Sequence, residues 1–269
     1  MLSNTSRMLT YLCALLYGVL GAFLFFMPEG LAPVFAWKVT PFMTMTIGGW
    51  CLGNAWQALF AARRFEKWGR VYSSLLYLGL FAVGESLVVY FFRDKLSLAH
   101  PVAWLYLLTL FVSLLTSLVM FLYWLRARPA LDKSREKTSS RQYFTLIVFI
   151  VFVGFLGLYG STASIGTPGT NGGIFPEIMS LFTLRSFGVF YLSIALAVVP
   201  FLWDRSLKAI LAHSIAAYGL IVFITIAAFV YIRLFDFAAR PGGLLYFGAY
   251  LGVGIPLLFG FRKYGLAIE

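Results

Sequence analysis

Charge and cysteine are both scarce in this 269-residue chain. Asp, Glu, Lys and Arg make up only 12% of the residues, about half the share typical of a soluble domain, whereas 61% are hydrophobic. A water-soluble globule of this size cannot bury so much apolar surface, so lipid must be the solvent. The two cysteines, Cys13 and Cys51, lie inside apolar segments and have no CxxC partner, which argues against a disulfide or a metal site.

The usual signatures of catalysis are missing from the sequence as well. There is no Walker A loop, no HExxH, no GxSxG, no Cys/His cluster and no aspartate pair suited to a metal. His100 and His213 fall on opposite sides of the predicted membrane, so they cannot jointly ligate a haem. The glycine-rich segment 160–173 lacks the strand and helix of a phosphate loop and is predicted to be a connection. We therefore expect no cofactor and no metal, and an intramembrane enzyme is the least favoured function.

What the chain does contain is eight apolar segments, each of about 18–24 residues and long enough to cross a bilayer core of about 30 Å as a helix. The first follows Arg7, but it is long for a signal peptide and no A-x-A site follows, so we interpret it as a retained span. The sequence predicts an all-α, polytopic integral membrane protein with eight transmembrane helices. The predicted spans are 8–27, 41–62, 71–92, 102–125, 143–160, 181–203, 209–232 and 244–261.

The basic residues predict which side of the membrane each connection faces. With the N-terminus inside, 15 of the 21 Lys and Arg residues fall in inner segments, as the positive-inside rule requires. Both termini are therefore predicted to be cytoplasmic, in a plasma membrane of the bacterial type. The formal net charge of +11 is assigned to these inner loops, and no nucleic-acid partner is expected.

A polar, basic stretch divides the eight spans into two sets of four. At an offset of 140 residues Pro101 aligns with Pro241 and Tyr106 aligns with Tyr246, which indicates an internal duplication. Because four spans return the chain to its starting side, the two copies would share one orientation, which is the parallel class of repeat. The predicted domains are a first four-span unit at 1–126, a cytoplasmic linker at 127–141 and a second four-span unit at 142–269.

Small and polar residues recur within the spans. The sequences Gly49–Gly53 and Gly248–Gly252 are GxxxG patterns, interpreted as close intramolecular helix contacts, with homodimerisation as the alternative. Thr46, Asn54 and Gln57 share one face of the second span, and amides in hydrocarbon need partners, so this face should point into the protein. Interhelical hydrogen bonding is favoured for that face over the lining of a polar cavity.

Glu85 is the one carboxylate well inside a predicted span, at a depth of about 10 Å. An intramembrane acid is costly and marks a candidate functional site. Arg185, in the sixth span, lies at a comparable depth, and one hypothesis pairs the two residues as ions across the two halves. The alternative is a protonated or hydrogen-bonded Glu85 and an Arg185 that reaches the outer surface.

Two functions follow from these patterns. The first is a small carrier or channel-like transporter with a pocket between the two four-helix units. The second is a non-catalytic accessory or scaffold subunit of a larger membrane complex. A hydrated cavity lined by Asn54, Gln57 and Glu85 would favour transport, whereas a dry interior with outward-facing apolar grooves would favour the accessory role. The expected partners are the lipid bilayer and either other membrane subunits or a second copy of the chain.

Overall fold

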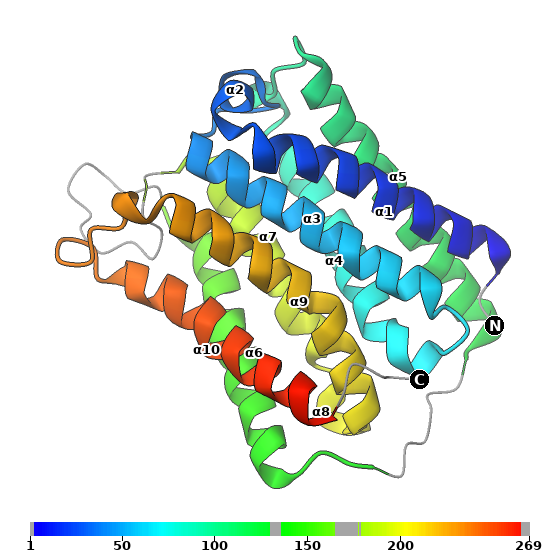
Figure 1. Cartoon of the computed structure of the whole chain (residues 1–269). Coiled ribbons are helices and arrows are strands. Elements are labelled where there is room, and N and C mark those ends of the chain that lie inside the picture. The colour runs from blue at the N-terminus through cyan, green and yellow to red at the C-terminus, as the bar shows by residue number, and fades with distance from the viewer. Residues whose placement is uncertain (1–2, 130–135, 165–176, 178, 265–269) are drawn as a thin grey trace.

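The computed structural model describes residues 3–129, 136–164, 177 and 179–264. Apart from one isolated bridge, the regular structure of these residues is helical, which confirms the all-α class (Figure 1). Each long helix overlaps one predicted apolar segment. The described helices of 18 residues or more are α1 (Asn4–Phe26), α3 (Pro41–Arg63), α4 (Trp68–Phe91), α5 (Pro101–Ala127), α6 (Ser140–Thr162), α7 (Leu181–Val198), α9 (Leu207–Val230) and α10 (Gly242–Tyr264).

Short helices and side-chain caps set the ends of the long helices. The single-turn helices α2 (Pro28–Leu31) and α8 (Phe201–Asp204) lie between α1 and α3 and between α7 and α9. The Ser139 side chain accepts a hydrogen bond from the Gln142 amide, and the Gln142 side chain accepts one from the Ser139 amide. This capping box fixes the start of α6. At the start of α3 the Thr40 side chain accepts from the Met43 amide, and Pro41 occupies the first turn.

Consecutive long helices run in opposite directions through one bundle (Figure 1). α1 begins, α5 ends, α6 begins and α10 ends at the same end of the bundle, which we call the linker end. The connections α1–α3, α4–α5, α6–α7 and α9–α10 lie at the opposite end, which we call the far end. This alternation matches the one that the sequence predicts.

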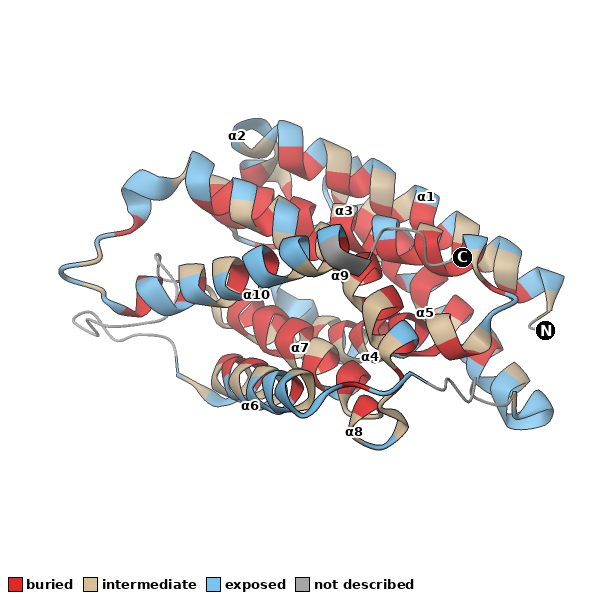
Figure 2. Ribbon diagram, turned by 60° about the horizontal axis from the view of Figure 1, so that its bottom comes forward, coloured by how far each residue is buried: buried red, intermediate tan, exposed pale blue. Residues whose placement is uncertain are grey.

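The chain is a polytopic membrane protein with seven candidate membrane spans among its described helices. Of the predicted spans, 41–62 is the exception, because α3 is not apolar enough to qualify. α3 lies between α1 and α9 and has most of its residues buried, so it packs mainly against other helices and leaves one face, with Trp56, partly open (Figures 1 and 2). A helix in this position can carry Thr46, Asn54 and Gln57 without exposing them to hydrocarbon. The helices α6 and α10 are peripheral, with 22% of their spans buried against 56% for α7.

The two GxxxG patterns have different surroundings. A Cβ added at Gly53 would lie 2.4 Å from Leu220 Cδ2 and 2.7 Å from Leu220 Cα, so this glycine lets α3 and α9 approach closely. The predicted intramolecular contact is confirmed for the first pattern. It is wrong for the second, because a Cβ at Gly248 or Gly252 would meet no described atom within 4 Å. α10 turns these two glycines outward, and homodimerisation through them stays a prediction.

The described part of the basic linker is fastened to the turn before α9. The Thr138 amide donates to the Arg205 carbonyl at 3.0 Å, and the Leu207 amide donates to the Glu136 carbonyl at 3.1 Å. The Lys137 ammonium donates to the Asp204 carbonyl at 2.9 Å. The end of the linker is therefore hydrogen-bonded to the second half of the chain before α6 begins. Residues 130–135 of the linker, and most of the glycine-rich segment 160–173, lie outside the described residues.

Candidate functional site

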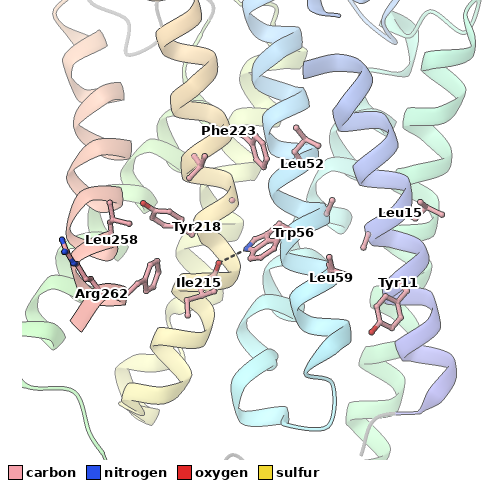
Figure 3. Close-up of a pocket in the computed structure, with 15 residues that line it drawn as sticks. Tyr11, Leu15, Leu52, Trp56, Leu59, Ile215, Tyr218, Phe223, Leu258 and Arg262 are labelled. Atoms are coloured by element: carbon pink, nitrogen blue, oxygen red, sulfur yellow. Dashed lines mark hydrogen bonds between the residues drawn. The ribbon is translucent and has the colours of Figure 1, made fainter. Parts of the chain in front are cut away.

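A groove of about 1090 Å³ lies on the side of the bundle (Figure 3). α3 forms its floor, α1 forms one wall, and α9 with α10 forms the other. The groove thus lies between helices of the first half of the chain and helices of the second half. Its lining residues are Tyr11, Ala14, Leu15, Leu52, Ala55, Trp56, Leu59, Ile215, Tyr218, Gly219, Val222, Phe223, Leu258, Phe261 and Arg262.

Two of the polar side chains that line the groove are bonded to neighbouring helices, so the rest of the wall is mostly apolar. The Trp56 indole Nε1–H donates to the Ile215 carbonyl at 2.9 Å, which ties the floor to α9 (Figure 3). The Tyr218 hydroxyl donates to the Gly254 carbonyl of α10 at 3.4 Å. The surface that remains for a ligand is aliphatic and aromatic, which suits an apolar molecule from the membrane.

The groove occupies only the half of the bundle nearer the linker end. On α3 its floor runs from Leu52 to Leu59, a rise of about 10 Å. Tyr11 and Arg262 lie at the end of the groove that is closer to the linker end (Figure 3). The Arg7 guanidinium lies 5.9 Å from the centre of the Tyr11 ring, and its Nε donates to the Ala62 carbonyl at 3.1 Å.

The polar residues singled out on α3 do not line this groove, because they lie on the opposite face of the helix. Asn54 and Gln57 are both 0% exposed. The Tyr77 hydroxyl donates to Asn54 Oδ1 at 2.7 Å, so Asn54 does join α3 to α4. Thr46 donates within its own helix to the Phe42 carbonyl at 2.9 Å. Asn54 Nδ2 and both amide atoms of Gln57 have no hydrogen-bond partner within the described part of the chain.

Glu85 is buried and connects three helices. Its Oε1 accepts from the Tyr106 hydroxyl of α5 at 2.7 Å and from the Ser186 hydroxyl of α7 at 2.8 Å. Its Oε2 is buried without a described partner, and the residue borders a cavity of about 20 Å³. A cavity of this size has room for about one water molecule. Glu85 therefore bridges the two halves of the chain through Ser186.

Glu85 is hydrogen-bonded, as one of the two sequence hypotheses states, and the ion pair with Arg185 that the other hypothesis states is not formed. Arg185 Nη1 instead donates to the carbonyls of Gly160 and Ala163, each at 2.9 Å. These carbonyls belong to the last turn of α6, where free C=O groups and the helix dipole favour a cation. The close approach of α6 to α7 brings them within reach, since a Cβ at Gly188 would lie 2.7 Å from the Gly160 carbonyl carbon. The contact of Glu85 with α7 is made by Ser186 instead.

The two histidines are far apart, as predicted. His213 is buried, and its Nδ1 lies 3.0 Å from the Ser73 hydroxyl, which itself donates to the Ala197 carbonyl at 2.6 Å. His100 is exposed at the start of α5, at the far end. A ligand role shared by both residues is therefore ruled out by their positions.

Contacts at the far end also join the two halves. The Trp37 indole donates to the Thr183 hydroxyl at 3.0 Å and stacks on Phe182 with ring centroids 4.2 Å apart. The Glu177 carboxylate accepts a hydrogen bond from the Thr40 hydroxyl. Burial raises the pKa of the Glu177 carboxyl above its ordinary value, and the Thr40 bond opposes that shift only in part. These contacts join the halves at the far end of the bundle, away from the half that contains the groove.

Within the described ranges, no group of three His, Cys, Asp or Glu residues could hold a metal ion. Comparison with protein-family models, curated proteins and solved structures finds no match. The groove residues of α3 were missed in the sequence, although Leu52, Ala55, Trp56 and Leu59 follow an i, i+3, i+4, i+7 spacing. That spacing places the four residues on one face of α3, opposite Thr46, Asn54 and Gln57. This arrangement was the sequence signal that could have identified the groove face.

Proposed function

We propose that this protein is a membrane carrier for an apolar or amphipathic molecule that enters the groove sideways from the lipid phase. The observation that carries the proposal is the groove itself, which is apolar, reaches about 1090 Å³ and is walled by helices of both halves. Pockets for small molecules typically measure about 300–1,000 Å³, so this groove is large enough for a lipid-sized ligand.

The carrier consists of eight spans in two parallel four-helix units, 1–126 and 142–269, joined by the linker 127–141. The closely packed pairs support this arrangement, because α1–α3 corresponds to α6–α7, α3–α9 to α7–α4, and α4–α5 to α9–α10. The pairs α1–α5 and α3–α4 have no equivalent among the close pairs of the described helices, so the two units are not packed identically. α3 is the eighth span, covered by its neighbours except along the groove. Both termini and the linker are cytoplasmic.

Transport in this scheme uses the boundary between the units. In carriers built from repeats, one unit rocks against the other around a site at their interface. The groove lies at such a boundary, and it is held by the Gly53–Leu220 contact of α3 with α9. The Glu85–Ser186 bond crosses the same boundary between α4 and α7. A rocking motion would change the width of the groove, and this change is what would load and release the ligand.

A groove-filling substitution tests the proposal. Val222 lines the groove and Ile226, one turn along α9, does not, although both are partly exposed to the membrane. Val222→Trp is expected to slow movement of a labelled lipid between the leaflets of reconstituted liposomes by about tenfold or more, an energetic loss of about 1.4 kcal/mol. Ile226→Trp is the matched control and should transfer lipid as the unaltered chain does. Equal rates for all three proteins would show that the groove is not the route.

An accessory subunit is the second candidate function. It is favoured by the outward-facing apolar groove and by the burial of Asn54, Gln57 and Glu85 away from that groove, the features that the sequence analysis assigned to this role. It is also favoured by the outward face of α10, where Gly248 and Gly252 have open space beside them and could receive a helix of another protein. Purification in mild detergent followed by native mass spectrometry distinguishes the two functions. A stable stoichiometric complex with another membrane protein would support the accessory role, and a chain that transfers lipid alone supports the carrier.

A further inference from the structure

The groove is chemically asymmetric along its length. Its aliphatic and aromatic residues extend from Phe223 and Leu52 towards the linker end, and Arg262 lies on the α10 side of the groove in the part nearer that end (Figure 3). Arg262 is the one charged residue of the lining. It is exposed and has no hydrogen-bond or ion-pair partner among the described residues. A free guanidinium offers a planar fork of donors that matches a phosphate or a carboxylate.

The length of the groove limits what can fill it. The floor extends for about 10 Å along α3, whereas one leaflet of the hydrocarbon core is about 15 Å deep, which is half of roughly 30 Å. A transmembrane helix of a partner protein would need a seat along the whole bundle, and the far half of α3 offers none because it is buried. An acyl chain of one leaflet fits this shorter seat.

The surroundings of the groove near the linker end favour an anionic head group. Arg7 lies beside Tyr11 on the α1 wall, and Arg64 lies 4.3 Å from the centre of the Phe60 ring at the end of the floor. The exposed acid Glu66 follows Arg64 in the turn after α3, and it does not line the groove. Positive charge near the membrane surface attracts anionic lipids.

We propose that the groove binds an anionic phospholipid from the leaflet at the linker end, with its head group on Arg262 and an acyl chain along Leu52, Ala55 and Val222. This inference rests on the proposed function, because it names the ligand of the same site. The tail would contact the apolar floor, and the phosphate would accept hydrogen bonds from the guanidinium. The result is selection by charge at one end and by apolar shape along the rest.

Lipid competition in nanodiscs tests this assignment. The purified chain is placed in a mixture of phosphatidylglycerol and phosphatidylcholine, and the lipids that remain bound are identified by native mass spectrometry. The unaltered chain is expected to retain phosphatidylglycerol in preference to phosphatidylcholine. Arg262→Gln should lower that preference about tenfold, equivalent to about 1.4 kcal/mol, and Arg262→Lys should restore part of it. The matched control is Arg126→Gln, which removes an exposed cation at the linker end of α5, outside the groove.

The outcomes separate this inference from the carrier proposal. Loss of preference in Arg262→Gln but not in Arg126→Gln supports the head-group assignment. If the chain binds lipids without preference and Val222→Trp abolishes that binding, the anionic assignment is overturned and the carrier site stays in place. Lipid binding that Val222→Trp does not affect would overturn both. A tightly bound polypeptide in place of lipid would overturn the assignment of a lipid as the occupant.

Discussion

Replacing Gly53 with alanine is expected to lower the free energy of unfolding by about 1–3 kcal/mol, the usual cost of overpacking a close contact. The added methyl group would overlap Leu220, whose Cα would lie 2.7 Å away, so a change of side-chain rotamer cannot relieve it. α3 and α9 would have to separate. Since these helices form the floor and one wall of the groove, lipid binding should fall together with stability.

The control for Gly53→Ala is provided by the other GxxxG pattern. A Cβ at Gly252 meets no described atom within 4 Å, and alanine has a higher helix propensity than glycine by about 0.5–1 kcal/mol. Gly252→Ala should therefore leave the free energy of unfolding unchanged or raise it slightly. Unfolding in mixed micelles, followed by circular dichroism, measures both variants. Equal losses of stability would contradict the assignment of one glycine to a contact and the other to an open face.

Replacing Glu85 with leucine is expected to destabilise the protein by several kcal/mol. The substitution leaves the Tyr106 and Ser186 hydroxyls without an acceptor, and each buried group left unsatisfied costs about 1–3 kcal/mol. Glu85→Gln keeps a carbonyl oxygen in the position of Oε1 and should retain most of the stability. The same unfolding measurement applies.

A double-mutant cycle identifies the cause of that loss. If unsatisfied hydroxyls explain it, Tyr106→Phe and Ser186→Ala should each destabilise the unaltered chain and should be neutral or stabilising in the Glu85→Leu background. Additive losses in the two backgrounds would show that the three side chains do not act together. Such a result would remove the Glu85–Ser186 bond from the interface between the halves.

The positions of the long helices could be predicted from the sequence because each transmembrane segment must satisfy its backbone internally over a fixed thickness. The burial of Asn54 and Gln57 followed from the cost of exposing amides to lipid, and both residues are fully buried. The sequence analysis predicted 41–62 as an apolar span, but α3 is not apolar enough to be a candidate span. A helix that is largely covered by protein does not need the apolar surface that lipid requires. Hydropathy alone does not reveal which helix is central.

The candidate site was less predictable for a physical reason. In water an apolar groove contrasts with a polar surface, whereas in a membrane lipid-facing and groove-facing residues are equally apolar, so Leu52 and Val222 resemble any exposed residue of a span. Of the two hypotheses for Glu85, the ion pair with Arg185 is not formed and the hydrogen-bonded carboxyl is, with Ser186 of α7 as a partner that the sequence did not name. Arg185 is instead attracted by the end of α6, which only the packed structure places nearby.

Photo-crosslinking from the floor of the groove tests most directly whether this is a lipid-binding site. A photoreactive amino acid in place of Leu52 probes the groove, and the same amino acid in place of Leu118, which is exposed on α5, samples lipid outside it. In nanodiscs, position 52 is predicted to form a lipid adduct that Val222→Trp abolishes, while the adduct at position 118 is unaffected. An adduct at position 52 that survives Val222→Trp unchanged would contradict the assignment of the groove as the binding site.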